Sequence, residues 1–150
     1  RAVTIATSAL HKFNTDVLLK VITDQLPEHP PYFDKDELTD RPVRFFVSEI
    51  IREKILKHFK KEIPYSVEVL VEEYKEEPKM DRIKATIFVE RETQKQILIG
   101  AGGRAIKRLG TDARRDIENF VGKKVFLDLT IKVRKDWRNS DRDLKEFGYS

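Results

Sequence analysis

The sequence predicts an α+β fold in which helices cover one face of a three-stranded sheet. Two observations support this prediction. Apolar residues recur at helical spacing in residues 43–59 and 104–121, and they alternate with polar residues in three stretches between residues 67 and 133. In chain order, residues 40–134 follow the pattern α-β-β-α-α-β, without the regular strand–helix alternation of a parallel α/β sheet.

Residues 1–26 form a separate N-terminal segment. Residues 2–7 are predicted to be a short strand and residues 17–26 a short amphipathic helix, with Thr15 or Asp16 as its cap. Three prolines then fall within five residues, and proline removes a backbone donor and disfavours helix before it. We therefore expect a linker over residues 27–39.

The first long helix should begin near the caps Thr39 and Asp40, place Pro42 in its first turn, and stop before Pro64. Its predicted inward-facing residues are Val43, Phe46, Val47, Ile50, Ile51, Ile55 and Phe59.

Two strands should follow and form a hairpin around a polar loop at residues 76–81. Their predicted core residues are Val67, Val69, Val71, Ile83, Ala85, Ile87 and Val89. The alternate positions are mostly polar: Glu68, Glu72, Arg82, Lys84 and Thr86. We therefore expect the sheet to bury one face and expose the other.

A brief helix near residues 93–98 leads to a glycine loop and a second long helix over residues 104–121, which Gly122 should end as a left-handed cap. The residues of this helix that should face inward are Ile106, Leu109, Ala113, Ile117 and Phe120. A third strand should bury Val125, Leu127, Leu129, Ile131 and Val133. Residues 135–150 form a tail that contains a short capped helix.

Composition excludes several classes of protein. Charged residues make up 37% of the 150 residues, and no apolar run approaches the roughly 20 residues that cross a bilayer. Cysteine is absent, so disulfides and thiolate metal sites are excluded, and the three histidines lack the spacing of metal ligands. No metal site is predicted. Because the sequence begins with Arg1 rather than Met, we expect a fragment of a longer protein.

Positive charge gathers in the second half of the sequence. Residues 1–78 carry 12 Lys and Arg against 15 Asp and Glu, whereas residues 79–150 carry 18 against 11. Residues 91–115 alone hold seven basic and two acidic residues. A positive stretch centred on a glycine loop suits a polyanion, although clustered charge also occurs on ordinary solvated helices.

The glycine loop is the strongest candidate site. Four of the six glycines lie in "ILIGAGGRAIKRLG", and Gly100, Ala101, Gly102 and Gly103 form a GxxG sequence between two helices. A loop without Cβ atoms lets a sugar–phosphate backbone approach its N–H groups, and the following helix directs its own free N–H groups to the same place. Arg104, Lys107 and Arg108 add positive charge on one side of that helix.

Two other interpretations of the loop fit the sequence less well. Gly100, Gly102 and Ala105 satisfy a relaxed dinucleotide-binding fingerprint, but no strand precedes the loop, and the acidic candidate Asp128 lies in the middle of a strand. The glycines also suit a tight corner between two helices that binds nothing. The arrangement helix–GxxG–helix, flanked by strands, is instead typical of KH domains, which bind single-stranded nucleic acid.

Longer stretches point to one family. "TDRPVRFFVSEIIREKIL", "IFVERETQKQILIGAGGRAIKRLG", "DIENFVGKKVFLDLTIKV" and "DWRNSDRDLKEFGY" resemble the C-terminal part of the Era-type GTPases, and the resemblance covers residues 27–150. It implies a type II KH domain over residues 40–134 with a mixed sheet, preceded by the final β-α unit of a Ras-like GTPase domain in residues 1–26. The implied function is binding of single-stranded RNA near the 3′ end of 16S rRNA and assistance to assembly of the 30S ribosomal subunit.

The resemblance also implies site residues. The expected RNA-binding residues are Gly100, Ala101, Gly102, Gly103, Arg104, Lys107, Arg108, Lys95, Ile99 and Ile106, with the last two lining a groove for unstacked bases. Ser8 and Ala9 resemble the last nucleotide-binding motif of the GTPase domain. The other GTPase motifs are absent from these 150 residues, so this chain should be no enzyme and need no cofactor, whereas the parent protein should bind GTP and Mg²⁺.

One residue departs from the family pattern. Relatives commonly carry Lys at the first variable loop position, where this sequence has Ala101, and Arg104 is the nearest substitute. Trp137 and Tyr149 in the tail are expected to anchor it rather than to stack on bases. The expected setting is a cytoplasmic monomer, with peripheral membrane association of the parent protein. A KH domain from another RNA-binding protein and an interaction module without a nucleic-acid ligand stay open as alternatives.

Overall fold

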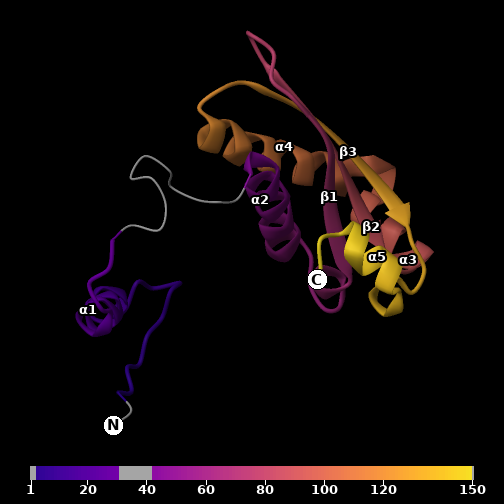
Figure 1. The fold of residues 1–150 in the computed structure, drawn as a ribbon. Coiled ribbons are helices and arrows are strands. Elements are labelled where there is room, and N and C mark those ends of the chain that lie inside the picture. The colour runs from indigo at the N-terminus through magenta and orange to yellow at the C-terminus, as the bar shows by residue number, and fades with distance from the viewer. Residues whose placement is uncertain (1–2, 31–41, 150) are drawn as a thin grey trace. The chain divides into compact units, whose positions relative to one another are not determined.

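A computed structural model describes residues 3–30 and 42–149 and divides the chain into two compact units, Arg1–Leu38 and Thr39–Ser150 (Figure 1). The predicted caps Thr39 and Asp40, and residues 31–39 of the predicted linker, lie outside the described residues.

The smaller unit contains one helix, α1 (Thr15–Gln25), close to the predicted helix. Two predictions about this unit are wrong. Residues 3–7 form no strand, because no described segment lies beside them to pair with, and only Ser8 and Phe13 form an isolated antiparallel bridge. Neither Thr15 nor Asp16 caps α1: Asn14 occupies the N-cap without a side-chain hydrogen bond, and the Thr15 hydroxyl instead donates to the carbonyl of Lys12.

The larger unit is built on a sheet of three strands, β1 (Val67–Lys75), β2 (Asp81–Val89) and β3 (Val125–Val133). The central strand β2 pairs antiparallel with β1 and parallel with β3, so β1 and β3 are the two edges. Val69, Ile87 and Ile131 lie side by side across the three strands and form one row of the core. The predicted α+β fold with a mixed three-stranded sheet is confirmed.

Helices α2 (Val43–His58) and α4 (Arg104–Val121) cover one face of this sheet, while α3 (Glu92–Ile99) joins β2 to the loop before α4. Six predicted core residues of α2 and α4 are completely buried: Val47, Ile51, Ile55, Leu109, Ala113 and Ile117. Val43 and Phe120 are 42% and 48% exposed, contrary to prediction, because both lie in terminal turns of their helices. The Phe120 ring packs against that of Phe46, with ring centroids 5.2 Å apart.

The sequence predicted that the second face of the sheet is exposed to solvent. This prediction is wrong at one end of the sheet, where that face is covered. Glu68 and Thr86 were expected to be exposed, but both are buried. The C-terminal tail, with a 3-10 turn (Trp137–Asn139) and α5 (Asp141–Glu146), packs here and places Phe147 against Phe88. Such long-range packing cannot be inferred from strand alternation.

The tail is held by specific contacts. Trp137 is 5% exposed and packs edge-on against Phe147. The Tyr149 hydroxyl donates to Glu68 Oε2 over 2.7 Å, and burial together with this hydrogen bond raises the pKa of Tyr149. Ser140 caps α5 by accepting from the Asp143 N–H. Both aromatic residues therefore anchor the tail, as expected.

Candidate nucleic-acid interface

The glycine loop is a tight connection between α3 and α4. The Gly100 N–H donates to the Gln96 carbonyl over 2.8 Å and ends α3, and the Gly103 N–H donates to the Gly100 carbonyl over 3.1 Å. Gly100 has φ +70°, and a Cβ atom placed there would lie 2.6 Å from the Cβ of Ala105. The close packing of α3 against α4 therefore requires glycine at this position.

The outer side of the loop is open. Gly102 has φ +60°, and a Cβ atom placed on it would meet no atom within 4 Å. Gly103 occupies the N-cap of α4 without a side-chain hydrogen bond. The first N–H groups of α4 consequently have no capping side chain, and they lie beside the open backbone of Gly102, which is the arrangement that accepts a phosphate.

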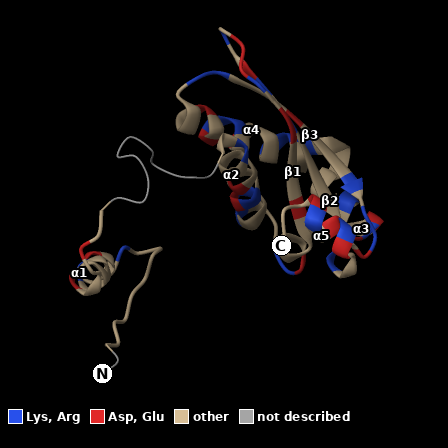
Figure 2. Cartoon of the chain, in the orientation of Figure 1, with Lys and Arg blue, Asp and Glu red and all other residues tan. Residues whose placement is uncertain are grey.

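Three predicted cations surround this opening. Arg104, Lys107 and Arg108 are exposed, and no carboxylate of the described residues forms an ion pair with any of them. Figure 2 marks the basic positions of α4 in blue. The Arg104 Nε donates to the Ala101 carbonyl over 3.1 Å, so the guanidinium lies against the loop at Ala101.

Two further charged residues beside this surface, Lys95 and Asp112, have ion-pair partners. Lys95 lies on α3 with its Nζ 4.0 Å from Glu92 Oε1, and its side chain is only 33% exposed. Asp112 shares a hollow of about 430 Å³ with the three cations. Its carboxylate is engaged by His58 Nε2 at 2.9 Å and by Arg115 at 3.5 Å, which limits its repulsion of a phosphate.

A second hollow of about 510 Å³ lies between α4 and the edge strand β3. Its lining residues are Ile106, Lys107, Gly110, Thr111, Arg114, Leu127 and Leu129. The predicted groove residue Ile106 is among them. The other predicted groove residue, Ile99, does not line this hollow, although like Ile106 it is partly buried against the core.

Leu127 and Leu129 of β3 form the apolar floor of this groove, and the sequence analysis did not predict this role. Leu127 and Leu129 were expected to be core residues, but they are only half-buried because β3 has no neighbour on its outer side among the described residues. Gly110 faces them from α4, and a Cβ atom there would lie 3.5 Å from Leu129 Cδ1. The sequence feature that could have indicated this groove is Gly110, a glycine in the interior of a long helix.

The residues predicted as a nucleotide-binding remnant lie in the smaller unit. Ser8 and Phe13 exchange backbone hydrogen bonds of 3.1 and 3.0 Å, and Ser8 Oγ accepts from the His11 N–H over 3.3 Å. Ala9 is exposed in the turn between them. Their role in nucleotide binding stays a prediction.

Two kinds of site are absent from the part of the chain that the structure describes. No group of three or more His, Asp or Glu side chains within residues 3–30 and 42–149 could hold a metal ion. In the same residues, no helix has the length and apolar character needed to cross a membrane.

Comparison with known proteins gives a family and two similar structures. A model of the KH domain family matches residues 62–138. The solved structures are a variant of Aquifex aeolicus Era bound to GDP and AlF4−, and Era in complex with MgGDPNP and nucleotides 1506–1542 of 16S ribosomal RNA. Each is 40% identical to this chain with a TM-score of 0.87, and each match covers 95% of this chain but 48% of the other. The chain therefore spans about half the length of these structures.

Proposed function

We propose that this chain, which belongs to the KH domain family, binds single-stranded RNA through its glycine loop and the groove beside it. Its resemblance to Era-type GTPases, confirmed by the two similar structures, makes the 3′ end of 16S rRNA the proposed target. Binding, rather than bond cleavage, is the activity of this part of the protein.

One observation carries the proposal: the open backbone at Gly102 adjoins both the unpaired cations of α4 and the apolar groove. A single strand presents its phosphates on one side and its bases on the other. We place the phosphates against the loop N–H groups, with Arg104, Lys107 and Arg108 neutralising their charge. Unstacked bases then lie in the groove over Ile106, Leu127 and Leu129. A strand of about four nucleotides fits this arrangement in KH domains.

The groove explains why the bound RNA should be single-stranded. In a duplex the bases are stacked and paired, so they cannot enter a hollow lined by apolar side chains. Base identity would be read by hydrogen bonds at the rim, where Thr111 and Arg114 supply polar groups. The phosphate contacts set the affinity without reading the sequence.

For the whole protein we propose GTP binding and hydrolysis with Mg²⁺, in a GTPase domain to which residues 1–26 contribute the final unit. Ser8 and Ala9 would then lie near the guanine base. The same proposal includes assistance to 30S subunit assembly and a cytoplasmic, monomeric state with a membrane-peripheral fraction. The remaining GTPase motifs are not in this sequence.

Replacing Gly102 by Asp tests the RNA-binding site. The new carboxylate would project into open space at the loop and repel a phosphate, so we expect the affinity for a single strand copying the 16S 3′ end to fall at least about tenfold, or about 1.4 kcal/mol. The matched control is Gly122→Asp, because Gly122 also has a positive φ, +69°, and open space around its Cα.

Fluorescence anisotropy of the labelled RNA measures both variants, and circular dichroism confirms that they fold. The left-handed backbone costs each variant a similar amount of stability, roughly 1–2 kcal/mol or less for Asp, so a difference in RNA affinity reports the position and not the strain. Equal affinity of the two variants for RNA would exclude the loop as the phosphate site. Equal affinity of the unsubstituted chain for a duplex would exclude the groove as a base site.

A further inference from the structure

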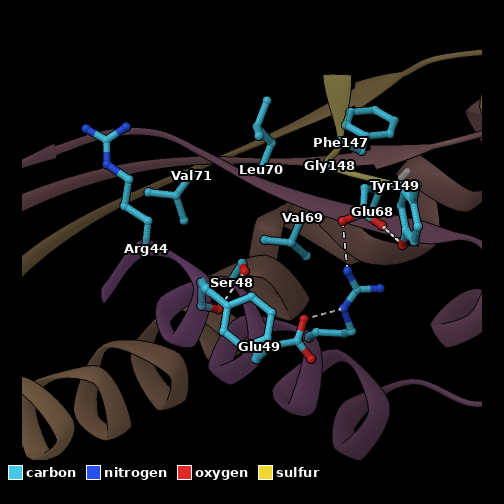
Figure 3. Close-up of a pocket in the computed structure, with 12 residues that line it drawn as sticks. Arg44, Ser48, Glu49, Glu68, Val69, Leu70, Val71, Phe147, Gly148 and Tyr149 are labelled. Carbon is cyan, nitrogen blue, oxygen red and sulfur yellow. Dashed lines mark hydrogen bonds and ion pairs between the residues drawn. The ribbon is translucent and has the colours of Figure 1, made fainter. Parts of the chain in front are cut away.

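A third groove lies between α2 and the edge strand β1, on residues that the RNA-binding surface does not use. Its volume is about 600 Å³ (Figure 3). Helix α2 lines it with Arg44, Phe45, Ser48, Glu49 and Arg52; β1 lines it with residues 68–71, and the tail with Phe147, Gly148 and Tyr149. None of these residues lines either hollow beside the glycine loop.

The strand side of this groove offers unpaired backbone groups. Strand β1 pairs only with β2 and has no neighbour on its outer side among the described residues. In an antiparallel pair, alternate residues direct their N–H and C=O groups away from the partner strand. Half of residues 68–71 therefore present a donor and an acceptor at the edge, which is the pattern that an added strand recognises.

The usable edge is short because both of its ends are blocked. At one end, Glu68 accepts from Arg52 over 2.8 Å and from Tyr149 over 2.7 Å, and the tail covers the strand. At the other end, the register shifts between Val71 and Glu73, and such a bulge bends the strand away from regular pairing. About three residues remain, 69–71, which span about 10 Å in an extended chain.

The two ends of the groove differ in charge. Arg52 is neutralised by Glu49 and Glu68, at 3.1 and 2.8 Å. Arg44 lies at the opposite end, apart from this network (Figure 3). It forms no ion pair with a carboxylate of the described residues; Glu73 interacts with it only at longer range and pairs with Lys75 instead. Between them, Phe45 is 40% exposed and Leu70 is half-buried, so the middle of the groove is apolar.

We propose that this groove binds an extended peptide segment of a partner protein, which adds as a fourth strand to β1. The peptide carries β-branched or other apolar side chains in its middle and an acidic side chain at the end that reaches Arg44. Main-chain hydrogen bonds to the free edge hold it, and the pairing of its carboxylate with Arg44 selects it. RNA suits the groove less well, because Arg52 is already paired with both Glu49 and Glu68, so this cluster is net negative and Arg44 alone would be left to neutralise phosphates.

The probe is the hexapeptide acetyl-Asp-Val-Thr-Val-Thr-Asp-amide with a fluorescent label, which has an acid at each end because the strand direction is not specified. Anisotropy with the full chain should give saturable binding with a dissociation constant below about 1 mM, and excess single-stranded RNA should not displace the peptide. Arg44→Glu should weaken binding at least tenfold, whereas Lys60→Glu, the same charge change at an exposed residue outside the groove, should leave it unchanged. A glutamate in the first turn of α2 also suits the helix dipole, so the variant should fold.

Two further peptides test the unsubstituted chain. Methylating alternate backbone nitrogens of the probe removes its hydrogen-bond donors on one edge at a time, and one of the two methylated forms should lose binding. Replacing both Asp residues by Lys should abolish binding to the unsubstituted chain and partly restore it with Arg44→Glu. The proposal is overturned if the probe does not saturate below about 1 mM, if both methylated forms bind like the parent, or if RNA displaces it.

Discussion

Gly100 and Gly102 occupy the same loop for different physical reasons. At Gly100, a side chain would collide with Ala105, so glycine there serves the packing of α3 on α4. At Gly102, a side chain would meet only solvent, so glycine there keeps the backbone accessible to a ligand. A substitution at Gly100 should therefore cost stability through both the collision and the positive φ, whereas one at Gly102 carries only the strain of its positive φ and should in addition lower RNA affinity.

Gly110 is a third glycine, and experiment can separate its effect on stability from its effect on RNA affinity. Glycine within a helix costs about 0.5–1 kcal/mol relative to alanine, so Gly110→Ala should raise the unfolding free energy by about that amount. Its new methyl group would lie 3.5 Å from Leu129 Cδ1, which is an ordinary contact, and would make the groove shallower. We therefore expect RNA affinity to fall while stability rises.

Urea denaturation and RNA anisotropy measure these two effects. Asn119→Ala is the control, because it also improves helix propensity in α4 but lies at an exposed position outside the groove. It should raise stability without changing RNA affinity. If Gly110→Ala binds RNA as tightly as the unsubstituted chain does, bases do not lie over Leu129.

The loop and its cations could be predicted from local sequence, because GxxG followed by Arg104, Lys107 and Arg108 is contiguous. Leu127 and Leu129 could not be assigned to the groove in this way. Their exposure depends on β3 being an edge strand and on the absence of a side chain at Gly110, and both are properties of the assembled fold. Arg114 lines the same groove.

At the scale of elements, α4 combines a buried apolar side with a cationic side. Lys107→Ala together with Arg108→Ala removes two cations that have no ion-pair partner among the described residues. Each phosphate contact on a single strand contributes about 0.7 to the slope of log affinity against log salt, so the slope should flatten by about 1.4. The preference for one RNA sequence over another should not change, because phosphate contacts carry no sequence information.

The control for this prediction is Arg115→Ala together with Lys124→Ala. Arg115 pairs with Asp112 and Asp116, and Lys124 pairs with Glu118, so their charges are already compensated. The slope measured by anisotropy at several salt concentrations should stay the same in this control. If both double variants flatten it equally, the affinity comes from overall charge and not from the proposed site.

A buried carboxylate fixes the start of β2 to the turn between α4 and β3. Asp81 accepts from Lys123 over 2.5 Å and from the Tyr74 hydroxyl over 2.8 Å. The hydrogen bond from Lys123 lowers the pKa of Asp81, although burial acts against it. Because the folded-state pKa is depressed, the carboxylate stabilises the fold above its unfolded pKa of about 3.9, and this contribution is lost as the pH falls through the folded pKa.

Asp81→Asn should therefore lower the unfolding free energy by about 1–3 kcal/mol at pH 7, through loss of the charged hydrogen bond. The difference from the unsubstituted chain should shrink as the pH is lowered from 5 toward 2, where the native carboxyl group is itself protonated. Urea denaturation across this range measures it, with Asp128→Asn, an exposed residue of β3, as the control. A difference that is independent of pH would contradict the assigned role of the charge.

Most elements of the larger unit could be predicted because apolar periodicity is local: α3, α4 and the three strands lie where the pattern placed them. The predicted strand at residues 2–7 failed because a strand needs a partner, and alternation alone supplies none. Burial of Glu68 and Thr86 could not be foreseen either. Glu68 is contacted by Tyr149, in a tail about 80 residues further along the chain. Thr86 donates to Glu72 of the neighbouring strand over 2.8 Å.

At the scale of the whole molecule, the two units differ in how they are held. The larger unit has a continuous core shared by its sheet and helices, whereas none of the residues of α1 is buried. Its apolar side chains Val17, Leu18, Leu19 and Ile22 are exposed in the described structure. This accords with the proposal that residues 1–26 belong to a GTPase domain.

The most direct test of the central claim is to map the RNA contacts on the ¹⁵N-labelled chain by NMR during titration with a single strand copying the 16S 3′ end. The account predicts that amide shifts concentrate in residues 100–111 and 127–129, with smaller changes elsewhere. Residues 44–52 and 68–71, which line the separate groove of α2 and β1, should shift little. Shifts centred on that groove or on the tail, or saturation with no change at residues 100–104, would contradict it.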